Sequence, residues 1–171
     1  GYRPNPLDTS VTDRFYMIKD VSLWQAPEAY EQVVEGDLYD ATANLLQSGS
    51  DTQKAQAELD LVGSKGWFIN LSGGEKVFSK AAVYNYVAFF TTYKGDRGAQ
   101  VDPCTLSSTQ GESRFYAIHM LNGSAVFEDL DGNPSSLSDS DRSKILHIPG
   151  MPPAPTLLFP GNDDGSPMGE V

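Results

Sequence analysis

One short segment constrains the fold more than any other part of the chain: Tyr86–Tyr93 reads YVAFFTTY. Aromatic and β-branched side chains fill it, and both kinds favour strands. Side chains alternate between the two faces of a strand, so the odd-numbered residues from Val87 share one face and the even-numbered residues share the other. Because both faces are apolar or nearly so, we predict a strand that is covered on both sides.

A six-residue motif occurs twice. Arg14–Lys19 reads RFYMIK and Arg114–His119 reads RFYAIH, with four of the six positions identical. Two near-identical strand cores in one chain suggest repeated supersecondary units, such as the blades of a propeller. We therefore expect two equivalent strands in repeated sheet units.

Turn signals separate the remaining strands. The apolar run Trp67–Leu71 ends at SGG, a turn sequence. Asn85 interrupts the run that leads into the 86–93 strand and predicts a tight hairpin turn. Asn122-Gly123 is the strongest hairpin signal, because both residue types tolerate positive φ. Together these patterns predict a mainly β fold built from antiparallel sheets.

Residues 27–62 have a different pattern. Pro27 opens a segment with a favourable first helical turn. Asp51 is a plausible N-cap for a second helix, one face of which would carry Ala55, Leu59 and Val62. We predict a helical insertion over 27–62 within a single β domain that spans 1–160, followed by a flexible tail over 161–171.

The charge balance excludes some partners. The chain has 171 residues, of which 23 are acidic and 12 basic, for a net charge of −11. This length suits one domain with a real core. An acidic surface repels phosphate backbones, so nucleic acid is not an expected partner. The chain also lacks the run of about 18 apolar residues that would predict membrane insertion.

The segment 129–135, DLDGNPS, is the best candidate for chemistry. Oxygen-bearing side chains at alternate positions are what a looped calcium site uses. We predict a calcium site in which Ser135, or its carbonyl, and Asp139 are weaker members. The main ligand cluster is Asp129, Asp131 and Asn133.

Two residues depart from the calcium-loop pattern. Pro134 stands where such a loop needs glycine for its sharp turn, and Ser140 stands at the twelfth position, which normally carries a carboxylate. We therefore expect weak binding, in the millimolar range of extracellular sites. A plain acidic turn is the alternative, because Asp, Gly, Asn and Pro all favour turns.

Catalytic constellations are not evident, so we do not predict an enzyme. His119 and His147 are far apart, and neither has a second ligand at metal spacing. Trp24 and Trp67 suggest packing residues, with a sugar-binding platform as the alternative. Cys104 is the single cysteine, either an unbonded loop residue or the partner of a cysteine elsewhere in a longer chain.

An ordered set of segments resembles the C-terminal propeller domain of the PilY family, the tip-associated adhesins of bacterial type IV pili. The set begins with GWF-x-x-L at 66–71 and continues with the VAFFTTY strand, DPC at 102–104, and RFYAI closed by Asn122-Gly123. Leu7–Asp20, residues 37–42 and residues 150–158 extend the resemblance at low density over nearly the whole chain.

The resemblance implies a partial or modified β-propeller that acts in pilus biogenesis and surface adhesion, with a calcium loop near 129–135. Its implied partners are minor pilins or other pilus components, and a host or abiotic surface. It also implies secretion to the bacterial cell surface, pilus or outer membrane. The first ten residues carry no signal-peptide pattern, but in a fragment of a longer protein that signal would lie upstream.

Two other functions stay open. Propellers with similar blade sequences occur in quinone-dependent dehydrogenases, but these need a cysteine pair or a clear metal and cofactor cluster, which one cysteine and two separated histidines do not supply. A glycan-binding or other ligand-binding β module is the further alternative.

Overall fold

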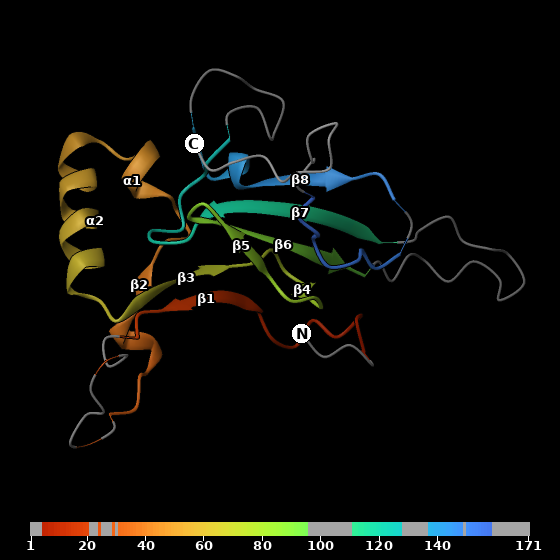
Figure 1. The fold of residues 1–171 in the computed structure, drawn as a ribbon, viewed down its shortest axis with the longest axis horizontal. Coiled ribbons are helices and arrows are strands. Elements are labelled where there is room, and N and C mark those ends of the chain that lie inside the picture. The colour runs from red at the N-terminus through yellow and green to blue at the C-terminus, as the bar shows by residue number, and fades with distance from the viewer. Residues whose placement is uncertain are drawn as a thin grey trace, which may run out of the picture.

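The computed structural model describes residues 5–20, 24, 29, 31–95, 111–127, 137–148 and 150–158. These residues form two sheets packed face to face, with two helices at one end (Figure 1). The three-stranded sheet has the order β1-β3-β2, and the five-stranded sheet has the order β4-β6-β7-β8, with β5 also paired to β6. The strands are β1 (Arg14–Ile18), β2 (Tyr39–Asp40), β3 (Gly66–Asn70), β4 (Glu75–Val77), β5 (Ala82–Tyr84), β6 (Val87–Lys94), β7 (Glu112–His119) and β8 (Ser143–Leu146).

The prediction of a mainly β fold is confirmed. All strand pairs are antiparallel except β2 with β3, which is parallel. Within the described ranges the strands close neither a barrel nor a propeller. The longest helix there, α2, has 13 residues, and none has the length and apolarity needed to cross a bilayer.

The strand predicted to be covered on both sides is β6, and the prediction is confirmed. On its inner face Phe90 is fully buried, with its ring stacked between Phe15 of β1 at 4.1 Å and Tyr116 of β7 at 4.7 Å. On its outer face the Thr91 hydroxyl donates a hydrogen bond to the Pro153 carbonyl at 2.8 Å. The segment 150–158 therefore covers the face of β6 that does not face the three-stranded sheet.

The two copies of the six-residue motif form strands, but not equivalent ones. The first copy forms β1, at the edge of its sheet, and the second forms most of β7, between β6 and β8. Phe15 packs in the core, whereas Phe115 pairs with Thr91 on the outer face and lies 5.9 Å from the ring of Phe89. The position of the motif whose side chain points into the core thus differs by one residue between the two copies. The prediction of two equivalent strands in repeated units is therefore wrong.

The predicted helical insertion over 27–62 is only partly right. Residues 31–34 form no helix, and Glu35–Asp37 forms a single 3-10 turn, η1. Tyr39–Asp40 forms β2, because its backbone pairs with β3. The helical part is α1 (Leu45–Ser48) and α2 (Asp51–Gly63). Residues 27, 28 and 30, and the predicted tail over 161–171, lie outside the described residues.

Two details of α2 also differ from the prediction. Ser50, not Asp51, is the N-cap: its hydroxyl accepts from the Gln53 N–H, and the Gln53 side chain accepts from the Ser50 N–H. This is a capping box. The face predicted to pack is exposed instead, with Leu59 68% and Val62 80% accessible, while Ala57 is buried.

The orientation of α2 has a tertiary cause. The Lys19 ammonium donates to the carbonyls of Leu61 at 2.8 Å and Ser64 at 2.9 Å, which ties the end of the helix to the residue after β1. Leu61 packs against the core. These contacts turn Ala57 and Leu61 inward and leave the other stripe exposed.

The predicted hairpin turns are present. Tyr84 pairs with Val87, so Asn85 and Tyr86 form a two-residue loop, and both have positive φ, at 46° and 61°. Such a loop suits the twist of the flanking strands. The Asn122-Gly123 turn also reverses the chain, because Ile118 bridges to Ala125. The SGG sequence ends β3, and the Glu75 N–H donates to the Ser72 carbonyl at 2.9 Å.

The two tryptophans have different environments. Trp67 is fully buried, and its indole N–H donates to the Met120 carbonyl at 3.0 Å, so its prediction as a packing residue is confirmed. Trp24 is 98% exposed, so the same prediction is wrong for it.

Gly123→Ala is expected to lower the free energy of unfolding by about 1–3 kcal/mol. Gly123 has φ of 68°, and a Cβ there would lie 3.0 Å from the ring of Trp67 and 3.2 Å from the Cβ of Ala41. The backbone strain and the clash act together. Gly73→Ala is the matched control, because a Cβ at Gly73 meets nothing within 4 Å. Urea unfolding measures the free energy of unfolding of both variants. Equal decreases in the two variants would contradict this role for Gly123.

Candidate binding groove

An open cavity of about 720 Å³ lies between the η1–β2 segment and α2. We call it the α2 groove. Its first wall is residues 36–40, and its second wall is residues 59–60 and 63–65. It is therefore built from two segments that are separated in the chain and brought together by the pairing of β2 with β3.

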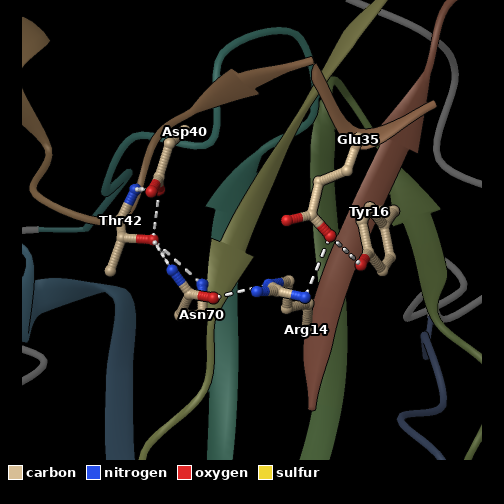
Figure 2. A network of polar contacts seen from close by, with 6 residues as sticks. All are labelled: Arg14, Tyr16, Glu35, Asp40, Thr42 and Asn70. Atoms are coloured by element: carbon tan, nitrogen blue, oxygen red, sulfur yellow. Dashed lines mark hydrogen bonds and ion pairs between the residues drawn. The ribbon is translucent and has the colours of Figure 1, made fainter. Parts of the chain in front are cut away.

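A network of polar contacts holds the first wall on the outer face of the three-stranded sheet (Figure 2). The Arg14 guanidinium donates to the Asn70 side-chain oxygen at 2.7 Å and to the Glu35 carboxylate at 2.9 Å. The Tyr16 hydroxyl donates to the same Glu35 oxygen at 3.3 Å. The cation also lies 5.4 Å from the ring of Phe68. Glu35 opens η1, so these bonds attach the start of the wall to β1.

The other half of the network attaches the end of the wall. Asp40 accepts the Thr42 N–H at 2.9 Å, and the Thr42 hydroxyl accepts both the backbone and the side-chain N–H of Asn70 at 3.0 Å (Figure 2). Asn70 therefore joins the two halves. Arg14 is a permanent cation in this network, because its hydrogen bond with Tyr16 and the charge of Glu35 raise its pKa above the ordinary value.

Two ion pairs of Lys65, which lines the α2 groove, connect its walls to the preceding segment. The Lys65 ammonium lies 3.4 Å from Asp37 and 3.3 Å from Glu31. The Val34 N–H bond, and then Lys65, hold the pKa of Asp37 below its ordinary value. This carboxylate therefore stabilises the fold above its unfolded-state pKa, and that contribution is lost as the pH falls through the lower folded-state pKa. At neutral pH both groups are charged.

The remaining acidic side chains of the groove are not neutralised in this way. Asp40 accepts from Thr42, and Asp60 accepts from the Gln56 amide at 2.7 Å. Neither forms an ion pair with another described residue. The groove thus carries three carboxylates, Asp37, Asp40 and Asp60, against the single ammonium of Lys65.

The predicted calcium ligands fall mostly beyond the described part of the chain. Asp129, Asp131, Asn133 and Ser135 lie outside it, as does Cys104. Asp139 is described: it is exposed and precedes the 3-10 turn η2 (Ser140–Arg142), and its carbonyl accepts the Arg142 N–H at 3.3 Å. The described residues contain no group of three or more His, Cys, Asp or Glu side chains that could hold a metal ion.

Asp141 is a residue that sequence reasoning missed as a candidate ligand. Its side chain is buried, and one carboxylate oxygen accepts from the Ser138 N–H at 2.7 Å and hydroxyl at 2.9 Å. The other oxygen is buried, and no described residue donates a hydrogen bond to it. A buried carboxylate oxygen that lacks a donor is suited to a cation. Asp141 follows Ser140, where the loop pattern asks for a carboxylate, so the local signal was present in the sequence.

Arg142 connects this region to the loop after β2. It is buried, and its guanidinium donates to the carbonyls of Thr42 at 2.8 Å and Ala41 at 2.5 Å. Burial lowers the pKa of Arg142 to about 10, so it remains a cation at neutral pH. It therefore ties the five-stranded sheet to the chain that leads out of the groove wall.

The histidines do not form a site. His119 lies in β7, where its Nδ1 accepts the Leu121 N–H at 3.4 Å, and His147 is exposed after β8. The described residues thus define a mainly β domain of two packed sheets with an open, acidic groove at one end. Comparisons with protein-family models, with curated proteins and with solved structures find no match.

Proposed function

We propose that this chain is a non-catalytic domain of a type IV pilus assembly and surface-adhesion protein, secreted and displayed at the bacterial cell surface, pilus or outer membrane. The observation that carries this proposal is the ordered set of segments that resemble the PilY family. Three of them form β3, β6 and β7, whose side chains pack in one core. A set of segments that meets in one core supports a shared architecture better than scattered matches would.

The finer fold proposal is a modified, partial propeller. Neighbouring propeller blades are sheets stacked face against face around a channel, and the shared core of the two sheets here supports this proposal. The parallel β2–β3 pair departs from an antiparallel blade. We therefore propose a modified, partial propeller of common ancestry with the family, in which the two sheets are not equivalent units.

Binding is the proposed mode of action. The α2 groove supports a limited contact with a pilus component such as a minor pilin, while other parts of the parent protein meet a host or abiotic surface. Side chains that hold the groove are engaged as fixed ions or hydrogen-bond partners, which suits recognition rather than turnover.

Genetic deletion tests the pilus role. Removing this domain from its parent protein is expected to reduce surface pili and twitching motility. Electron microscopy of pili and a subsurface twitching assay measure the two effects, and complementation with the intact gene is the control. Unchanged piliation and motility would overturn the proposal.

Calcium is a second part of the proposal. Asp129, Asp131, Asn133, Ser135 and Asp139 would supply ligands, and the orphaned oxygen of Asp141 supports a further ligand. Calcium that binds only the folded chain raises its stability with the logarithm of the free concentration over Kd. The melting temperature should therefore rise at millimolar calcium. We expect a smaller rise in Asp141→Asn than in the control variant Asp51→Asn. No shift with calcium, and no heat in a calorimetric titration, would contradict it.

Glycan binding is retained as a second candidate function, because Trp24 is 98% exposed. An exposed indole can stack on a sugar ring. Glycan-array binding that is lost in Trp24→Ala would favour this function, and an array without signal would exclude the glycans it displays.

A further inference from the structure

We propose that the α2 groove binds a segment of a protein partner that presents a Lys or Arg side chain beside an apolar side chain. The proposal rests on the binding role given above, but not on the pilus assignment. Three features of the groove carry it: the exposed apolar stripe of α2 beside it, two carboxylates that form no ion pair with another described residue, and its preorganised first wall.

The apolar part is the stripe formed by Ala55, Leu59 and Val62 on α2. These residues are spaced to share one helix face, yet Leu59 is 68% and Val62 80% exposed. Leu59 also lines the cavity, so the stripe continues into the groove. A helix whose apolar stripe faces solvent beside a cavity is suited to a partner that covers both.

The charge of the groove selects the partner. Lys65 is already paired with Asp37 and Glu31, whereas Asp40 and Asp60 have only neutral hydrogen-bond donors among the described residues. An incoming ammonium or guanidinium could form a direct ion pair with these carboxylates, and an acidic segment would be repelled. Leu59, Asp60 and Asp40 all line the same cavity, so the groove presents an apolar side chain and carboxylates to one partner. Charge complementarity therefore favours a basic side chain next to an apolar one.

The groove is also preformed. The network of Arg14, Glu35 and Asn70 fixes its first wall before any partner arrives (Figure 2). A wall that is already ordered reduces the entropy lost on binding. The cavity of about 720 Å³ is within the range of ligand pockets, so it can receive side chains but not a folded domain.

A synthetic peptide tests the proposal on the 171-residue chain. The probe is acetyl-Gly-Lys-Leu-Gly-Lys-Leu-Gly-amide, compared with a peptide that has Gln for Lys and one that has Ser for Leu. Amide chemical shifts measured by NMR report both affinity and location. We expect the probe to shift the amides of Leu59, Asp60 and residues 36–40, and we expect each altered peptide to bind about tenfold more weakly.

Protein variants separate the groove from general attraction to an acidic chain. Asp60→Asn with Leu59→Ser is expected to weaken the probe about tenfold. Glu58→Gln with Val11→Ser is the matched control, because it removes the same charge and one exposed apolar side chain, and neither residue lines the cavity. Unchanged circular dichroism shows that both variants fold.

The outcomes are distinguishable. Equal weakening in the two variants, or shifts spread over the whole surface, would mean nonspecific ionic adsorption and would overturn the proposal. No binding of the probe would overturn it as well. Groove binding in a chain whose deletion leaves piliation unchanged would support the groove while rejecting the pilus role.

Discussion

Phe90→Ala is expected to lower the free energy of unfolding by about 3–5 kcal/mol. Phe90 is fully buried and stacks on Phe15 from one sheet and Tyr116 from its own. Removing the ring therefore leaves a cavity at the contact between the sheets and breaks two aromatic stacks. Urea unfolding followed by tryptophan fluorescence measures the loss, since Trp67 lies in the same core.

Phe127→Ala is the control for this experiment. Phe127 has the same side chain but is 44% exposed, so we expect a loss of less than about 1 kcal/mol. If Phe90→Ala does not fold, Phe90→Leu retains most of the volume and provides a measurable intermediate. A Phe90→Ala loss no greater than that of Phe127→Ala would show that the two sheets do not share this core.

Asp13→Ala is expected to cost about 3 kcal/mol of unfolding free energy, because it leaves a buried charge unpaired. The Lys76 ammonium lies 2.7 Å from the Asp13 carboxylate, and the Lys76 side chain is only 5% exposed. Asp13 precedes β1, and Lys76 lies in β4. The pair thus bridges the two sheets. Thermal or urea unfolding at neutral pH measures the effect.

The double variant Asp13→Ala with Lys76→Met separates the pair from the residues themselves. Removing both charges leaves no unpaired ammonium, so we expect most of the lost stability to return. Glu31→Ala is the exposed counterpart, since its ion pair with Lys65 lies on the surface, and we expect it to cost less than about 1 kcal/mol. If the double variant is no more stable than Asp13→Ala, the burial argument fails.

Much of the sheet structure could be predicted from local patterns. The alternation in β6, the apolar run of β3 and the turns at Asn85 and Gly123 are short-range signals, and each corresponds to an observed element. β2 could not be predicted, because two residues carry no periodicity. Its place depends on pairing with β3 and on the bond from Asn70 to Thr42, 28 residues away.

The groove lies beyond local prediction for the same reason. Its walls come from separate segments, and Arg14 fixes one of them from a third. The spacing correctly predicts that Leu59 and Val62 share one helix face. It does not predict which face of the helix packs against the sheets. That choice depends on Lys19, which binds the end of α2 from beyond β1.

The opposite facing of the two copies of the motif has a consequence for aligning this chain with others. Letter identity equates Phe15 with Phe115, but the two rings that flank Phe90 are Phe15 and Tyr116. Adjacent aromatic residues make the motif ambiguous, because either ring can serve as the inward one. An alignment of the two strands by residue identity would pair core-facing positions of one strand with surface-facing positions of the other. A template built on that alignment would exchange core and surface residues along the whole strand.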